Sequence, residues 1–70
     1  KPHPEPFLRA AWLVGVDPAD AVAIDDSRTG AASGLAAGMR TIFWPEAPME
    51  GPDGAIVINS AGDLRKQLGL

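Results

Sequence analysis

The 70-residue chain has room for one small domain, whose hydrophobic core is marginal at this length. It contains no cysteine, which excludes disulfides and thiolate metal sites as sources of stability. The mild net charge of −3 supplies no basic stripe for phosphate backbones, and no apolar stretch is long enough to cross a bilayer. We therefore expect no nucleic-acid or membrane partner, and a cytoplasmic location.

The first predicted element is a helix over Glu5–Val14. Its apolar residues recur at helical spacing and form one stripe, which consists of Phe7, Leu8, Ala11 and Trp12. A proline fits the first turn, and Gly15 is a typical C-terminal stop. We expect this stripe, Trp12 included, to lie in the core. Residues Asp17–Asp20 are then typical of a turn.

The rest of the chain alternates short apolar runs with helical segments. Strands are predicted over Ala21–Asp25, Arg40–Phe43 and Ala55–Ile58, and helices over Thr29–Ala37 and from a Ser60 cap to about Leu68. A Pro/Gly-rich loop over Trp44–Gly54 separates the last two strands. This alternation predicts an α/β fold that is part of a doubly wound, Rossmann-like parallel sheet, with three strands in sequential order and helices on both faces.

Two adjacent carboxylates, Asp25 and Asp26, follow the apolar run Val22–Ile24. Desolvating such groups is costly unless a cation or a hydrogen-bond network offsets the cost. In open α/β folds, ligands gather beyond the carboxyl ends of the parallel strands, which is where this pair should lie. Because Mg²⁺ takes oxygen ligands in octahedral geometry, two carboxylates are a partial ligand set. The pair therefore predicts half of a Mg²⁺ site.

Each of these residues also has an ordinary structural role. Asp26 or Ser27 could cap the following helix, and Asp25 could be an exposed acid at the end of a strand. His3 lies between two prolines, and because the chain has no second imidazole to share a metal, we expect it to be exposed and without function.

For Trp44 and Arg28, the sequence leaves a functional and a structural interpretation open. Trp44 follows a predicted strand, so it could line the rim of an active site or cover the edge of the sheet. Arg28 lies beside the acidic pair and could contact a substrate or phosphate, although surface arginines beside acids are commonplace.

A wider pattern surrounds the acidic pair. The segment Lys1–Phe7 reads Lys-Pro-x-Pro-x-Pro-Phe, Ile24–Gly30 reads Ile-Asp-Asp-Ser-x-x-Gly, and Ala36–Met39 follows. In this order and spacing, these residues resemble motifs three and four of the haloacid dehalogenase-like (HAD) hydrolase superfamily, in its phosphoglycolate phosphatase and β-phosphoglucomutase branch. The resemblance is close from Lys1 to about Phe43 and covers the remainder by its β-α order.

The resemblance implies a role for each matching residue. Lys1 matches the catalytic and substrate-binding lysine, which in this family neutralises the nucleophilic aspartate and the transferring phosphoryl group. Asp25 and Asp26 match the acids that hold Mg²⁺ directly or through water. Ser27 and Gly30 match the small residues that form the turn into the next helix.

Other parts of the family pattern are missing. The Asp-x-Asp motif that holds the nucleophile is absent, and so are the second motif and the substrate-selecting cap. The chain also starts at Lys1 rather than at Met. We therefore expect residues 1–70 to be the C-terminal part of a Rossmannoid core domain. The resemblance implies a parent that hydrolyses a phosphoric monoester with Mg²⁺, through an aspartyl-phosphate, on a small sugar phosphate or phosphoglycolate-type metabolite. The fragment alone should be inactive.

Two alternatives stay open at this point. A phosphorelay receiver also uses an acidic pair and a lysine around Mg²⁺, but there the lysine comes late, whereas here Lys1 precedes Asp25. The other alternative is a non-catalytic α/β module that associates with itself through an exposed sheet edge. In the related enzymes the nucleophile strand lies beside the strand that ends in the acidic pair. We therefore expect Val22–Ile24 to be an unpaired edge, or to pair with the missing N-terminal half or another chain.

Overall fold

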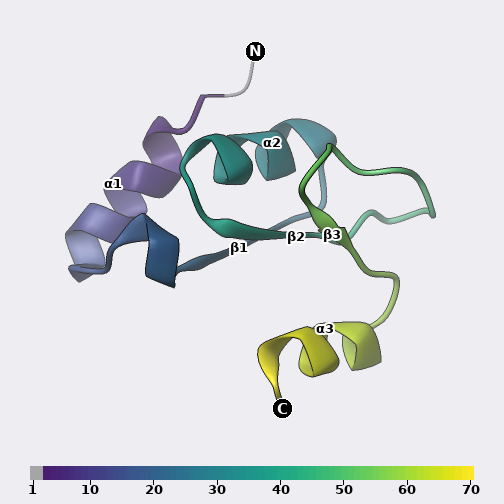
Figure 1. The fold of residues 1–70 in the computed structure, drawn as a ribbon. Coiled ribbons are helices and arrows are strands. Elements are labelled where there is room, and N and C mark those ends of the chain that lie inside the picture. Colours follow the sequence, from purple (N-terminus) through teal and green to yellow (C-terminus); the bar gives the residue numbers. More distant parts are fainter. Residues whose placement is uncertain (1–2) are drawn as a thin grey trace.

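Three parallel strands form one sheet in the computed structural model, which describes residues 3–70. The strands β1 (Val22–Asp25), β2 (Arg40–Phe43) and β3 (Ile56–Val57) lie in the order β1-β2-β3. Each of the helices α2 (Arg28–Ala36) and α3 (Ala61–Leu68) follows a strand in the chain, and the two lie on opposite faces of this sheet (Figure 1). The predicted α/β fold, with sequential strand order and helices on both faces, is confirmed.

The N-terminal helix α1 (Glu5–Val14) packs beside α2 on the same side of the sheet. Its bounds are those predicted, as are those of β2 and α3, whereas β1, α2 and β3 each differ from the prediction by one residue at one or both ends, as is usual for frayed ends. The predicted turn before β1 is a short 3₁₀ helix, η1 (Pro18–Asp20), whose first backbone groups are capped by Asp17. The peptide N–H of Ala19 donates to Asp17 Oδ1 at 2.9 Å.

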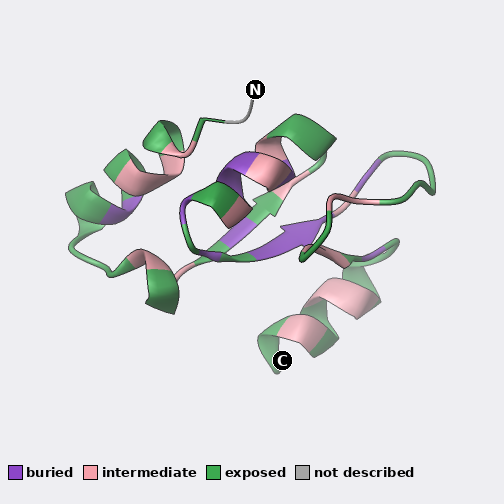
Figure 2. Cartoon of the chain, turned by 45° about the horizontal axis from the view of Figure 1, so that its top comes forward, coloured by how far each residue is buried: buried purple, intermediate pink, exposed green. Residues whose placement is uncertain are grey.

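The core centres on β2, which has a strand on each side. Its residues Thr41, Ile42 and Phe43 are almost completely buried, as is Ile58 beyond β3. Figure 2 shows this burial running along β2 and the facing side of α2, whereas α3 contains no buried residue. Helix α3 is tied to the sheet by Arg40, whose Nη2 donates to the carbonyl oxygen and the Oε1 of Gln67 at 3.0 and 2.9 Å.

Small residues allow α2 to lie close to the sheet. A Cβ at Gly34 would come within 2.8 Å of Ala23 Cβ and 2.9 Å of Thr41 Oγ1, and neither atom belongs to a flexible side chain. The helix ends at Ala36 with Ala37 as its C-cap, and Gly38 takes the left-handed conformation (φ 81°) that turns the chain back into β2. This close approach fixes where the N-terminus of α2 stands relative to the end of β1.

Gly34→Ala is therefore expected to lower the free energy of unfolding by about 1–2 kcal/mol, because overpacking outweighs the gain in helix propensity. Gly62→Ala in α3 is the matched control, because its Cβ would meet only Ser60 Oγ at 3.7 Å. The control is expected to stabilise the protein slightly. Urea unfolding of both variants measures the difference, and equal effects of the two substitutions would contradict the close packing.

Strand β1 is an edge of the sheet within the described residues, since β2 is its only partner there. Its side chains Val22 and Ile24 are 40% and 44% exposed, which is high for residues of a parallel strand. The predicted exposed edge at Val22–Ile24 is confirmed. On its outer edge, this strand therefore presents backbone N–H and C=O groups with which a further strand could pair, and two apolar side chains that a further segment could cover.

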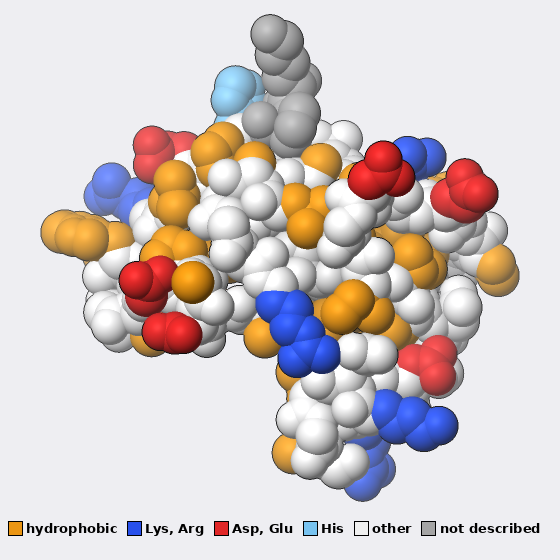
Figure 3. All heavy atoms as spheres, viewed as in Figure 1, with side chains coloured by type: hydrophobic (Ala, Val, Ile, Leu, Met, Phe, Trp, Pro, Cys, Tyr) orange, Lys and Arg blue, Asp and Glu red, His pale blue; other side chains and the backbone are white. Residues whose placement is uncertain are grey.

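The expectation that Trp12 lies in the core is wrong, because its side chain is 75% exposed. Helix α1 contacts α2 and η1, and its Ala11 is buried in a cluster with Ala23, Ala37 and Met39, against which Phe7 and Leu8 are partly buried. This contact covers only part of the predicted stripe, so Trp12, and Leu13 and Val14 after it, face outward. Figure 3 shows hydrophobic side chains on the surface over α1, and α3 projecting from the rest of the molecule. None of the helices within residues 3–70 has the length and apolarity that a membrane crossing requires.

Candidate functional site

The acidic pair lies at the carboxyl end of β1. Side chains alternate along this strand, so Ala23 and Asp25 face α2 whereas Ile24 faces the opposite side of the sheet. Asp25 is the last residue of the strand and Asp26 the first of the short connection to α2. The two adjacent carboxylates therefore start from different backbone environments.

Asp25 is half-buried and hydrogen-bonded. Its Oδ1 accepts from the backbone N–H of Ser27 at 2.8 Å and from Ser27 Oγ at 2.9 Å. Its carboxyl group lies directly against Gly30 in the first turn of α2, where a Cβ would overlap with it. The orientation of this carboxylate is thus set by contacts with the beginning of the helix.

Asp26 is exposed, and no hydrogen bond to its carboxylate is found within residues 3–70. The structure also decides between the two candidate caps of α2. Ser27 Oγ accepts from the backbone N–H of Gly30 at 2.9 Å, so Ser27 is the cap. Asp26 has both of its carboxylate oxygens available to solvent or a ligand.

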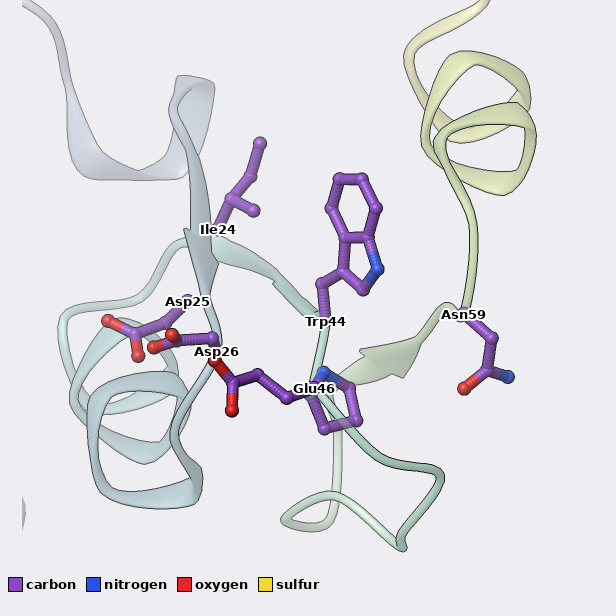
Figure 4. A pocket seen from close by; sticks show the side chains of 7 residues that line it. Ile24, Asp25, Asp26, Trp44, Glu46 and Asn59 are labelled. Carbon is purple, nitrogen blue, oxygen red and sulfur yellow. The ribbon is translucent and has the colours of Figure 1, made fainter.

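An open pocket of about 510 Å³ lies beyond the carboxyl ends of the three strands. It is lined by Ile24, Asp25, Asp26, Trp44, Pro45, Glu46 and Asn59. Figure 4 shows the carboxyl groups of Asp25, Asp26 and Glu46 toward one side, and Trp44 and Asn59 toward the other. Asp26 and Glu46 also border a neighbouring hollow of about 430 Å³. The pocket has the position expected for a ligand site in an open α/β sheet.

The pocket is acidic. Three carboxylates line it, and among residues 3–70 no lysine, arginine or histidine does. An anionic ligand would be repelled there unless a cation came between. The oxygens of Asp25 and Asp26 suit a hard cation such as Mg²⁺, and one oxygen of Asp25 and both of Asp26 have no protein partner within the described part of the chain. The two residues therefore fit one side of a Mg²⁺ site.

The ligand set is incomplete within residues 3–70, which contain no group of three or more side chains placed to hold a metal ion. Mg²⁺ usually keeps several waters and is held by one or two carboxylates, so two acids are consistent with this ion. The remaining positions fall to water, to a ligand, or to protein groups outside this part of the chain.

Of the other candidate residues, only Trp44 is found to line the pocket within the described part of the chain. Lys1, for which a catalytic and substrate-binding role was predicted, lies outside the described residues. His3 is exposed, and Arg28 is an exposed residue at the start of α2 that does not line the pocket. Trp44 is half-buried and lines the pocket together with Ile24, a position that agrees with the rim interpretation.

Sequence reasoning missed Glu46 and Asn59 as pocket residues. Glu46 comes three residues after the end of β2, and Asn59 comes two residues after the end of β3. Both could have been found from the sequence, because each is a polar residue just beyond the carboxyl end of a predicted parallel strand. These ends meet at one edge of the sheet, where ligands bind.

A family model described as HAD-hydrolase-like matches residues 1–46. Hexitol phosphatase B of Escherichia coli (strain K12) is 47% identical over 45 residues, which cover 64% of this chain and 20% of that protein. The β-phosphoglucomutase of Bacillus subtilis (strain 168) is 38% identical over 69 residues, which cover 97% of this chain and 30% of that protein.

A solved structure is similar as well. The crystal structure of a HAD family hydrolase from Deinococcus radiodurans R1, with bound phosphate and sodium, superposes with a TM-score of 0.76 at 36% sequence identity. The match covers 99% of this chain and 34% of that one. The chain thus spans about a fifth to a third of the length of these relatives.

Proposed function

Because this chain belongs to the HAD-hydrolase-like family, we propose that it is the C-terminal part of the core domain of a Mg²⁺-dependent phosphohydrolase. The observation that carries the proposal is the acidic pair at the end of β1, which lines a pocket beyond the carboxyl ends of the parallel strands. The full-length protein that contains this chain is called the parent below. Its proposed location is the cytoplasm.

The proposed substrate is a small phosphorylated metabolite of the sugar phosphate type, with phosphoglycolate as the neighbouring possibility. The names of two relatives, hexitol phosphatase B and β-phosphoglucomutase, support this class. The phosphate and sodium in the solved relative support a site that takes an anion together with a cation. This class also agrees with the acidic pocket, where a phosphate needs a positive charge beside it.

Asp25 and Asp26 are proposed to hold the Mg²⁺. When bound, the ion would place positive charge beside the phosphoryl oxygens, which is the main demand of phosphoryl transfer on a protein. Lys1 is proposed to bind the same phosphoryl group as a second positive charge, as the family motif implies. The nucleophile, which would form the aspartyl-phosphate, is proposed to come from the part of the parent that precedes this chain.

The exposed edge of β1 is the proposed place for that missing part. A strand added there would cover Val22 and Ile24, and its carboxyl end would lie next to Asp25. The alternative occupant is a second copy of the chain, which would make the 70 residues an association module. The family match favours the enzyme over this module and over a phosphorelay receiver.

The 70-residue chain alone is expected to release no measurable phosphate from sugar phosphates, because no two of its aspartates have the spacing of the nucleophile motif. It should also bind Mg²⁺ only weakly, since two carboxylates leave most coordination positions to water. Phosphate release and Mg²⁺ titration, with the parent as the positive control, measure both. Hydrolysis by the short chain at the rate of the parent would show that the catalytic groups have been misassigned.

A further inference from the structure

We propose that Ser27 and Gly30 are positioning residues that hold the Asp25 carboxylate in one orientation, so that the two adjacent acids contribute unequally to cation binding. Asp25 offers the cation its Oδ2 alone, because Oδ1 is committed to Ser27. Asp26 offers both of its oxygens. This inference rests on the proposed function, because it concerns the same Mg²⁺ site.

The first step is a chain of hydrogen bonds that runs from the helix to the carboxylate. The backbone N–H of Gly30 donates to Ser27 Oγ at 2.9 Å, and the Ser27 hydroxyl donates to Asp25 Oδ1 at 2.9 Å. A hydroxyl has one proton and two lone pairs, so both bonds are satisfied at the same time. The Ser27 backbone N–H adds a third bond to Oδ1 at 2.8 Å. Bonds linked in this way polarise and strengthen one another.

The second step is the space at Gly30. A Cβ there would overlap with Asp25 Cγ and with both of its carboxylate oxygens, so the whole carboxyl group lies against the backbone of residue 30. Any side chain at this position requires Asp25 to turn away. The helix around Gly30 is itself fixed to the sheet by the close approach of Gly34 to Ala23 and Thr41. Asp25 therefore has little freedom to choose another orientation.

The third step is the contrast with Asp26. Its carboxylate is exposed, has no hydrogen-bond partner within residues 3–70, and borders both the pocket and the neighbouring hollow. One acid of the pair is thus oriented in advance by the protein, and the other is free to adjust to the ion. Replacing a group that hydrogen-bonds a metal ligand typically lowers metal affinity 10- to 100-fold.

The test uses the parent and measures Mg²⁺ affinity by calorimetric titration without substrate. Ser27→Ala and Gly30→Ala are each expected to weaken Mg²⁺ binding by about 10- to 100-fold. Ser27→Thr, which keeps a hydroxyl, is expected to restore most of the affinity lost in Ser27→Ala. Circular dichroism checks that each variant is folded. If Gly30→Ala does not fold, the comparison of Ser27→Ala with Ser27→Thr tests the inference.

Two matched controls separate positioning from ordinary helix stability. Ser60 caps α3 as Ser27 caps α2, with its Oγ accepting from the Asp63 N–H at 3.1 Å, and Gly62 lies in the first turn of α3. Ser60→Ala and Gly62→Ala are expected to leave Mg²⁺ affinity unchanged. The inference is overturned if Ser27→Ala and Gly30→Ala bind Mg²⁺ as tightly as the unaltered parent.

The outcomes also distinguish this inference from the proposed function. Loss of Mg²⁺ binding in Asp26→Asn, with unchanged affinity in both Ser27→Ala and Gly30→Ala, would overturn the inference and keep the proposed site. An unaltered parent that binds no Mg²⁺ would overturn both.

Discussion

Asp26→Asn in the parent is expected to lower turnover at limiting Mg²⁺ by about 100-fold, which corresponds to a loss of roughly 3 kcal/mol of transition-state stabilisation. Asparagine keeps the shape of the side chain and removes its charge. Because Asp26 is exposed and offers both oxygens to the pocket, the missing charge should act on the cation and not on the fold. Steady-state rates across a Mg²⁺ titration measure the effect.

Stability provides the control for this experiment. Since Ser27 caps α2, Asp26→Asn and Asp26→Ala should each change the free energy of unfolding by no more than about 0.5 kcal/mol. Asp53→Asn removes the same charge from an exposed loop position and is expected to leave turnover unchanged. Full activity of Asp26→Asn at limiting Mg²⁺ would mean that Asp26 is not a metal ligand.

Phe43→Ala is expected to lower the free energy of unfolding of the core domain by about 3–5 kcal/mol. Phe43 is completely buried at the end of the central strand β2, directly before the pocket residue Trp44. The loop after β2 folds back onto it, because a Cβ at Gly51 would come within 2.7 Å of Phe43 Cδ2. Removing the ring leaves a cavity beneath the loop that carries Glu46, so the pocket wall should loosen as well.

Leu13→Ala is the matched control for this second experiment. Leu13 is 66% exposed on α1, so its truncation should change stability by no more than about 0.5 kcal/mol. Urea unfolding gives the two free energies, and hydrogen exchange of the amides of residues 44–54 reports on the loop. Similar costs for the two truncations would show that Phe43 does not anchor the core as described.

The alternation of short apolar runs with capped helical segments was sufficient to predict the α/β class, the strand order and the bounds of α1 and β2. The bounds depend on residues within a few positions of one another, namely helical periodicity, caps and turn residues, and the strand order follows from the right-handed crossovers that such alternation implies. The same local pattern located Asp25 and Asp26 at the end of the first strand. The exposed edge at Val22–Ile24 was also predicted, because the family resemblance indicated which strand is missing beside it.

Only the tertiary structure decided which residues share a site and how the two acids differ. Glu46 and Asn59 join the acidic pair because parallel pairing brings the ends of three strands to one edge of the sheet, over separations that no local pattern spans. Trp12 is exposed because the contact between α1 and α2 covers a narrow strip, whose width depends on packing and not on periodicity. Asp25 differs from Asp26 because the first turn of α2 lies against one carboxylate and leaves the other free. Sequence neighbours with the same charge therefore acquire different surroundings through the position of the following helix.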